Sequence, residues 1–447
     1  MLRYAHNDDN LEKGLYLGGL CDLCGRKIIM KTFLNTLILI TIFFTGKAYA
    51  LTMDEAVKLA LEKNNKIKEY AHKEKSQRYQ VKASKSEFLP NLDLSYSYTK
   101  LDEASAYQDK ESSVASIEAS YNLFNGFIDS NKVDEAKSLL HAYEFERKAV
   151  EADIIYTVKI AYIEVLRARK GLQVESETVE LLKKEKKDAE LFYREGITAK
   201  NELLKVEVEL ASAKQKYLLS KSRLVTAIDR LNRFTGAALS DETDIADLAA
   251  ETSAEKNYRA IRGQIPEERS ELKYLQALRK SKEYNLKTIK GEYLPTVDFS
   301  LSQSSFGDST SPSGRSGDDA ETRAMLTAKW ELADRVKKNH SADSMTAQIA
   351  SISARIEDLK DELKLQLSSA IEEHGLARGR IEVAKKGVEQ ANENYRITSN
   401  QFRQQVATST DLLDAGIALA RAKNDYNNAT YDLHEAIAKI ERVEESY

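Results

Sequence analysis

The sequence has very little proline and cysteine, and each shortage excludes a class of structure. Only four prolines occur among the 447 residues, at positions 90, 266, 295 and 312. Because proline interrupts helix interiors, this scarcity permits helices of unusual length. The only cysteines are Cys21 and Cys24. No further ligand pair completes a four-ligand zinc site with them, so neither a disulfide framework nor a structural zinc ion is expected.

An excess of charge of one sign is also missing. The chain has 67 basic and 71 acidic side chains, so no excess of positive charge points to nucleic acid as a partner. The few histidines form no HExxH motif, and there is neither a Gly-x-Ser-x-Gly motif nor a glycine-rich phosphate loop. We predict that the protein is not an enzyme, binds no nucleic acid, and uses no cofactor or metal ion.

The N-terminal region contains an export signal. Lys31 follows Met30, residues 33–44 are mostly apolar, and Ala48-Tyr49-Ala50 matches a small-x-small cleavage site. The apolar run is shorter than the roughly 20 residues that a helix needs to span a bilayer. Residues 30–50 are therefore predicted to be a signal peptide, and residues 1–29 an upstream mis-start or extension.

The remaining chain contains two copies of one unit. The segment EFLPNLDLS, which begins at Glu87, recurs as EYLPTVDFS from Glu292. A second pattern, which ends at Tyr217, recurs with its end at Tyr426. The polar stretch 307–321 can absorb the few extra residues of the second copy, as exposed loops do. The predicted organisation is a first repeat at 51–235, an equatorial connector at 236–265 and a second repeat at 266–447.

Each copy contains two candidate strands after its Leu-Pro pair. Apolar and polar residues alternate there with a period of two, over residues 92–98, 115–123, 297–301 and 324–332. Strands of about ten residues with one apolar face, joined by polar loops, fit transmembrane hairpins. A small soluble sheet with one wet face would show the same alternation. Four strands cannot close a barrel, because small barrels begin near eight, so several subunits would have to share one.

Two long helices are predicted, one in each copy. Residues 131–194 and 336–403 lack proline and clusters of turn residues. In the second segment isoleucines and leucines follow the alternating spacing of a coiled-coil seam, at positions 349, 352, 356, 359 and 363. At 1.5 Å per residue, a helix of some 60 residues reaches about 90 Å, which suits the periplasm better than a compact domain.

Taken together, these motifs resemble the TolC family of outer-membrane efflux proteins. The resemblance rests on LTMDEA from Leu51, ALEKNN from Ala60, LFNG from Leu123 and the two Leu-Pro strand starts. It implies a mainly α subunit with a small β part. Three subunits would form a twelve-stranded outer-membrane β-barrel, with four strands from each, continued by a long periplasmic α-helical barrel.

Membership of this family would imply location and partners. The protein would lie in the outer membrane of a Gram-negative bacterium and extend into the periplasm. Its partners would be two further copies, outer-membrane lipid, a periplasmic adaptor (membrane fusion) protein and an inner-membrane transporter of the RND or ABC type. Tyr121 and Trp330 occupy matching positions near strand ends and suit an aromatic belt at the membrane interface.

The same resemblance places the adaptor contact at the turns that end the two long helices. In the first copy these residues are Gly196 and Ile197, and Gly196 suits the left-handed conformation that ends a helix. In the second copy they are Gln405 and Val406. Because Gln405 replaces the glycine of the family, the second tip departs from the family pattern.

A ring of acids is predicted at the periplasmic aperture. Asp411 and Asp414 match two aspartates of the family, and their i, i+3 spacing places both on one helix face. Glu202 takes the place of a third aspartate. Three copies of these carboxylates would favour cations at a narrow opening. Alternatively, Asp411 could cap the returning helix through its N–H groups.

The hydrogen bonds that close the aperture in the family are missing. Phe402 stands where the family has tyrosine, and Ala407 stands where it has arginine. Contacts from residues such as Arg194 or Arg403 would have to hold the resting aperture closed. We therefore predict an outer-membrane channel of a tripartite efflux pump or type I secretion system. The alternative is a periplasmic coiled-coil structural or tethering protein whose strands never enter a membrane.

Overall fold

A computed structural model divides the chain into two units, Met1–Ala50 and Leu51–Tyr447. The structure describes residues 50–103, 110–241, 243–248, 258, 267–313, 320–332 and 334–446. The predicted signal peptide and the residues before it lie outside the described residues, as does most of the predicted connector. The fold below is that of the second unit.

The two halves of this unit share the order helix, two strands, long helix, helix, and the first half begins with one additional short helix. The first half contains α2 (Met53–Lys63), α3 (Asn65–Ser86), β1 (Asn91–Lys100), β2 (Glu111–Phe124), α4 (Ile128–Arg194) and α5 (Lys200–Thr235). The second half contains α6 (Ser270–Gly291), β3 (Thr296–Gly307), β4 (Ala320–Lys329), α7 (Arg335–Arg403) and α8 (Ser409–Glu444). The predicted class, mainly α with a small β part, is confirmed.

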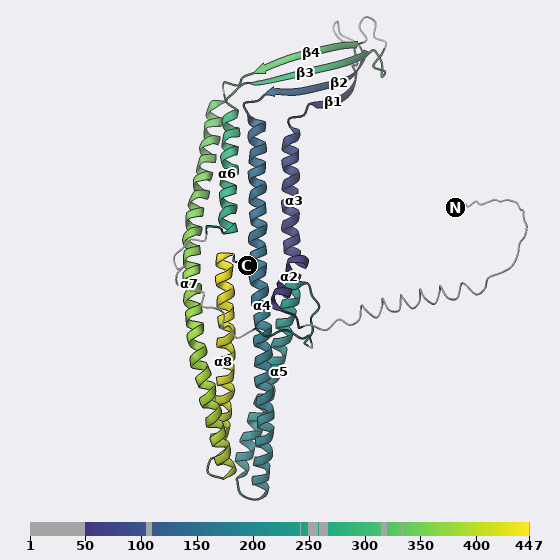
Figure 1. The fold of residues 1–447 in the computed structure, drawn as a ribbon. Coiled ribbons are helices and arrows are strands. Elements are labelled where there is room, and N and C mark those ends of the chain that lie inside the picture. Colours follow the sequence, from purple (N-terminus) through teal and green to yellow (C-terminus); the bar gives the residue numbers. More distant parts are fainter. Residues whose placement is uncertain are drawn as a thin grey trace, which may run out of the picture. The chain divides into compact units, whose positions relative to one another are not determined.

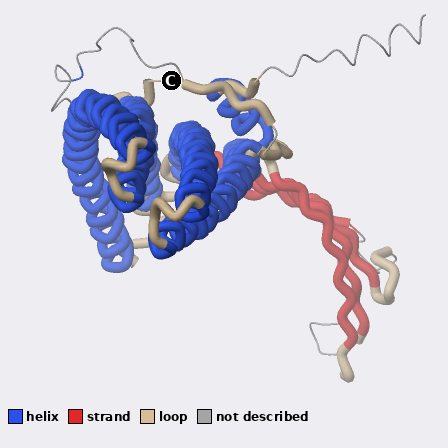
Figure 2. The backbone as a smooth tube through the Cα atoms, turned by 90° about the horizontal axis from the view of Figure 1, so that it is seen from below, coloured by secondary structure: helices blue, strands red, loops and turns tan. Residues whose placement is uncertain are grey.

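The two longest helices connect the sheet with the turns at the opposite end (Figure 1). Helix α4 has 67 residues and α7 has 69, which corresponds to about 100 Å at 1.5 Å per residue. On the sheet side α3 and α6 accompany them, and on the far side α5 and α8 do (Figure 1). Seen along their axes, the helices form a curved group from which the strands lead away (Figure 2). Among the described residues, no helix combines the length and the apolar character that a membrane crossing requires.

The four strands form one antiparallel sheet in the order β1-β2-β3-β4. The register aligns Tyr121 with Phe299, and Phe299 with Leu326, so apolar residues from three strands share a row. A bulge between Asn122 and Phe124 interrupts β2 near its end. Within the described residues, β1 and β4 each pair on one side only. The sheet is therefore open at two edges.

A close approach of two glycines joins the strand ends to the helices. Gly126 follows β2 and adopts a left-handed backbone (φ +70°). A Cβ atom at Gly126 would lie 2.3 Å from the carbonyl oxygen of Gly291, the last residue of α6. Only glycine allows this contact at this backbone conformation, which gives a physical reason for the LFNG motif.

The largest core cluster lies where α2, α4 and α5 meet. Val158, Tyr162 and Leu231 are fully buried there. The Tyr162 hydroxyl lies 2.8 Å from the carbonyl oxygen of Leu51, which also forms a parallel bridge to Ile245. The first residues of the unit are thus fixed to the middle of the helices.

A smaller core cluster lies in the second half. Ile356 and Leu363 of the predicted coiled-coil seam are buried there, and they pack against α6.

Candidate aperture and helix tips

The turn after α4 forms the first tip. Gly196 adopts the left-handed conformation (φ +72°), which lets the Ile197 N–H donate to the Phe192 carbonyl at 2.8 Å. This hydrogen bond satisfies a carbonyl that the helix end would otherwise leave free. The Ile197 side chain is 48% exposed. The predicted tip residues Gly196 and Ile197 thus present an apolar group to solvent at the end of the first hairpin, which we define as α4 and α5.

The turn after α7 has the same backbone geometry although its sequence differs. Gln405 takes the left-handed conformation (φ +64°), and the Val406 N–H donates to the Gln401 carbonyl at 2.8 Å. Val406 is 73% exposed. The departure of Gln405 from the family pattern therefore changes the side chain at the second tip but not its backbone. We define α7 and α8 as the second hairpin.

Asp411 caps the start of α8. The Thr408 N–H donates to Asp411 Oδ2 at 2.9 Å, and the Asp411 N–H donates to Thr408 Oγ1 at 3.2 Å. The Thr408 hydroxyl also donates to Oδ2 at 2.7 Å. The hydroxyl and then the backbone N–H of Thr408 lower the pKa of the Asp411 carboxyl. This is the capping role foreseen as the alternative, and it holds the carboxylate ionised at the tip.

The other two predicted aperture acids differ in environment. Asp414 follows one turn later on the same exposed face, and none of the described residues forms an ion pair with it. Glu202 Oε1 accepts from Lys205 Nζ at 2.8 Å, whereas its Oε2 is buried without a hydrogen-bond partner. Lys205 Nζ also lies 3.1 Å from Thr410 Oγ1 of α8. Lys205, which the sequence did not single out, thus links the start of α5 to the start of α8.

An aromatic pair joins the two hairpins near their tips. Phe402 is buried and packs against Phe192 of α4, with ring centroids 5.5 Å apart at 59°. The side chains of Arg194 and Arg403 are exposed, and neither forms a side-chain hydrogen bond or an ion pair within the described part of the chain. That contacts from residues such as Arg194 or Arg403 hold the resting aperture closed stays a prediction. The contact between Phe402 and Phe192 is apolar, because a phenylalanine side chain has no hydrogen-bond donor.

A second contact between the hairpins lies deeper, between α4 and α7. The Tyr395 hydroxyl donates to Glu185 Oε1 at 2.9 Å. Glu185 is 5% exposed, and burial raises the pKa of its carboxyl to about 7. Burial and the neighbouring Glu185 raise the pKa of Tyr395 as well. Sequence inspection missed this pair, although Glu185 interrupts an otherwise apolar spacing formed by Val179, Leu182 and Ala189.

A small apolar core joins the hairpins around these contacts. Leu413 of α8 packs with residues of α4 and α5, namely Val179, Leu182, Ala189, Val206, Leu210 and Ala213. Gly416 of α8 lies against Leu181 and Tyr395, where a Cβ would make ordinary contacts at 3.6 and 3.7 Å. The structure thus brings the two tips together within one chain, through apolar packing and a few polar links.

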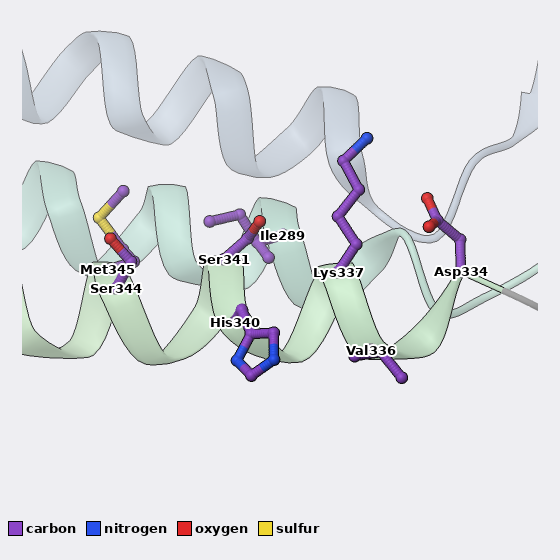
Figure 3. Close-up of a pocket in the computed structure, with 8 residues that line it drawn as sticks. All are labelled: Ile289, Asp334, Val336, Lys337, His340, Ser341, Ser344 and Met345. Atoms are coloured by element: carbon purple, nitrogen blue, oxygen red, sulfur yellow. The ribbon is translucent and has the colours of Figure 1, made fainter.

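A hollow of about 810 Å³ lies far from the tips, where α6 and α7 approach the sheet. Figure 3 shows that the side chains of Lys337 and His340, which line it, point in different directions. Its polar groups do not converge on a common point. In the described ranges, no group of three or more acidic, histidine or cysteine side chains could hold a metal ion.

Tyr121 and Trp330 lie at the helix side of the sheet. Tyr121 is within β2, opposite Phe299, and is 39% exposed. Trp330 directly follows β4 and is 57% exposed, with Nε1 donating to the Tyr293 carbonyl at 3.0 Å. Both aromatic rings are therefore available to an environment outside the subunit.

The sequence matches the family model described as outer membrane efflux protein, over residues 56–237 and again over 262–443. No protein of curated function matches it. Solved structures share the fold at low identity. The outer-membrane channel OprN matches with a TM-score of 0.76 and 15% identity, over 88% of this chain and 89% of its own. The outer membrane protein VceC of Vibrio cholerae matches with a TM-score of 0.75 and 15% identity, over 88% of this chain and 96% of its own. The MtrE outer membrane channel of Neisseria gonorrhoeae, in its open state, matches with a TM-score of 0.74 and 15% identity, over 88% of this chain and 88% of its own.

Proposed function

Because this chain belongs to the outer membrane efflux protein family, we propose that it forms the exit duct of a tripartite efflux pump or type I secretion system. One observation carries the proposal. A sheet with two unpaired edges sits at one end of paired helices about 100 Å long. Such a subunit can complete neither a barrel nor a helical wall alone, and it is long enough to reach across a periplasm.

Family membership fixes the broader part of this conclusion. The protein is a channel of the outer membrane that extends into the periplasm, and it is not an enzyme. The alternative of a periplasmic tether whose strands never enter a membrane does not fit a family of outer-membrane channels.

A homotrimer is the assembly that the sheet supports best. Three copies of the four-stranded sheet would give twelve strands, an even number within the range of outer-membrane barrels. Closure would pair β1 of one copy with β4 of the next and leave no free edge. Leu92 and Leu94 of β1 are 70% and 83% exposed, and outer-membrane lipid would cover them. Tyr121 and Trp330 would then lie at the membrane interface.

The exposed tips suit a periplasmic partner. Ile197 and Val406 project from turns of the same backbone geometry, so an adaptor protein could bind Gly196–Ile197 and Gln405–Val406 in one way. The adaptor would join the duct to an inner-membrane transporter of the RND or ABC type. The domain boundaries at 235/236 and 265/266 stay predictions, as does the equatorial role of the segment between them.

Asp411, Asp414 and Glu202 are proposed to surround the periplasmic opening. All three lie at the tip end of the hairpins, and Lys205 brings Glu202 near the start of α8. In a trimer the carboxylates would concentrate negative potential in a narrow passage and favour cations. The solved MtrE channel was captured in an open state, which supports an aperture of variable width in this fold.

Conductance in planar bilayers tests the aperture. Asp414→Asn removes a charge and leaves the Asp411–Thr408 cap intact, so cation preference and block by multivalent cations should both weaken. Asp411→Ala/Asp414→Ala should abolish the block. Asp425→Ala, an exposed acid on the same helix away from the tip, is the matched control and should conduct like the unmodified channel. Unchanged selectivity in the double variant would mean that these aspartates do not line the opening.

The partners require a separate experiment. Cross-linking in intact cells, followed by purification of the full-length protein, should recover one adaptor and one transporter. The transporter class would then distinguish a tripartite pump from type I secretion. Outer-membrane fractions should contain trimer bands that dissociate on heating, and a soluble periplasmic monomer would overturn the proposal.

A further inference from the structure

Glu185 is a buried acid at the contact between the two hairpins. It occupies the apolar face of α4, and its Oε1 accepts one hydrogen bond, from Tyr395 of α7. Its second oxygen, Oε2, is buried and has no hydrogen-bond partner. An ionised carboxylate normally needs several donors when it leaves water, and one donor does not replace them. The site therefore accommodates the neutral acid better than the charged form.

The neighbouring groups provide no positive charge to offset an ionised Glu185. On α4 the negative charge of Asp188 also disfavours ionisation of Glu185. On α7 the titratable neighbour is Tyr395, which Ser399 and Arg403 influence in turn. On α8 Gly416 lies against the Tyr395 ring, and on α5 Glu207 pairs with Lys186 at 2.9 Å. Within the described residues, no lysine or arginine forms an ion pair with Glu185.

We infer that Glu185 and Tyr395 form a proton-controlled latch, which holds the hairpins together while Glu185 is protonated and weakens when it ionises. The inference rests on the proposed channel function and adds a regulator to it. Because the contact joins α4 to α7, its loss weakens the attachment of the two hairpins to each other and makes it easier for their tips to move apart. An acidic periplasm would hold the aperture closed, and a neutral or alkaline one would allow it to open.

The direction of the effect follows from the pKa. The packed state raises the pKa of Glu185 from its ordinary value of 4.5 to about 7. A carboxyl whose pKa is raised by packing favours the packed state fully below its ordinary pKa. The contribution of the protonated carboxyl to the packed state declines as the pH rises from about 4.5 towards 7. Above about pH 7 none of this contribution remains. The latch should thus respond between mildly acidic and neutral pH.

Hydrogen exchange of the purified full-length protein tests the latch without requiring conduction. Unmodified protein and Glu185→Gln are compared at the same pH, so the intrinsic pH dependence of exchange cancels. Glutamine stays neutral and keeps an acceptor for Tyr395. At pH 4, below the ordinary pKa of the carboxyl, the peptides around Glu185 and Tyr395 should exchange nearly equally in both proteins. At pH 8.5 they should exchange at least about tenfold faster in the unmodified protein, since each pKa unit corresponds to a tenfold change.

Two further variants make the test decisive. Glu180→Gln alters an exposed acid of α4 that pairs with Lys183, and it should behave like unmodified protein at both pH values. Glu185→Met should also remove the pH dependence, and it replaces Glu185→Gln if that variant does not fold. Equal exchange in unmodified protein and the neutral variant at pH 8.5 would overturn the latch and leave the channel proposal untouched. The conductance of the Asp411→Ala/Asp414→Ala variant tests the aperture, and hydrogen exchange of the Glu185 variants tests the latch. The proposed channel function and the latch can therefore fail separately.

Discussion

At the scale of single residues, the two helix tips reach the same backbone geometry with different side chains. Gly196 and Gln405 both adopt a left-handed conformation, at φ +72° and +64°. Glycine adopts this conformation freely, whereas for a residue with a Cβ atom the left-handed conformation costs roughly 1–2 kcal/mol of conformational free energy. No atom lies within 4 Å of the position that a Cβ would take at Gly196. The difference between the tips is therefore one of backbone energy rather than packing.

Opposite substitutions at the tips should change stability in opposite directions. Gly196→Ala should lower the free energy of unfolding by about 1 kcal/mol, because alanine is strained at a positive φ. Gln405→Gly should raise it by about 0.5 kcal/mol, since the greater freedom of glycine in the unfolded chain offsets part of the gain. Thermal unfolding followed by circular dichroism measures both. A stabilising Gly196→Ala would show that the left-handed turn is not the populated geometry.

At the scale of elements, the sequence predicted the long helices closely. The segments 131–194 and 336–403 became α4 (Ile128–Arg194) and α7 (Arg335–Arg403). Absence of proline and a regular apolar spacing are local properties, so they can be recognised without knowing the fold. Likewise, period-two alternation located all four strands. The register among the strands depends on pairing between distant segments and had to come from the structure.

The contacts between the hairpins could not be predicted in the same way. Phe192 and Phe402, and likewise Glu185 and Tyr395, are about 210 residues apart in the chain. No local pattern indicates that such residues meet. Repeat alignment even obscures the aromatic pair, because it places Phe402 opposite Tyr193 rather than beside Phe192. Only Glu185 left a signal, as an acid among the apolar positions of α4.

Removing the aromatic contact should loosen the tips. Phe402→Ala deletes a buried ring that packs on Phe192, and large-to-small changes of this kind cost about 3 kcal/mol. The loss falls on the contact between hairpins, so conductance of the resting channel should rise at constant pH. Phe402→Leu should give a smaller increase, because it retains apolar bulk.

Single-channel recording measures this effect. Ile397→Ala, which truncates a 43% exposed residue of α7, serves as the matched control and should leave conductance unchanged. If Phe402→Ala conducts like the control, the aromatic pair does not hold the resting aperture, and the contact from Lys205 to Thr410 becomes the stronger candidate.

At the scale of the whole molecule, the subunit is incomplete at its sheet. All residues of β1 are exposed, and its two faces differ in character. Leu94 belongs to the apolar face and aligns with Ile117 of β2. Ser95 belongs to the other face, where its hydroxyl lies 2.8 Å from that of Ser116. An apolar face this exposed requires a cover, and in the proposed trimer lipid provides it while the polar face lines the lumen.

Adjacent substitutions in β1 separate this arrangement from a soluble sheet. Leu94→Arg would place a charge on the lipid face in all three subunits, at a cost of about 2–4 kcal/mol each near the bilayer midplane. Ser95→Arg, the next residue, would direct the same side chain into the aqueous lumen. We expect Leu94→Arg to deplete heat-modifiable trimers from the outer membrane and Ser95→Arg to retain them, as measured by electrophoresis of membrane fractions with and without heating. Equal assembly of both variants would contradict a lipid-facing Leu94, because only the face of the strand distinguishes the two positions.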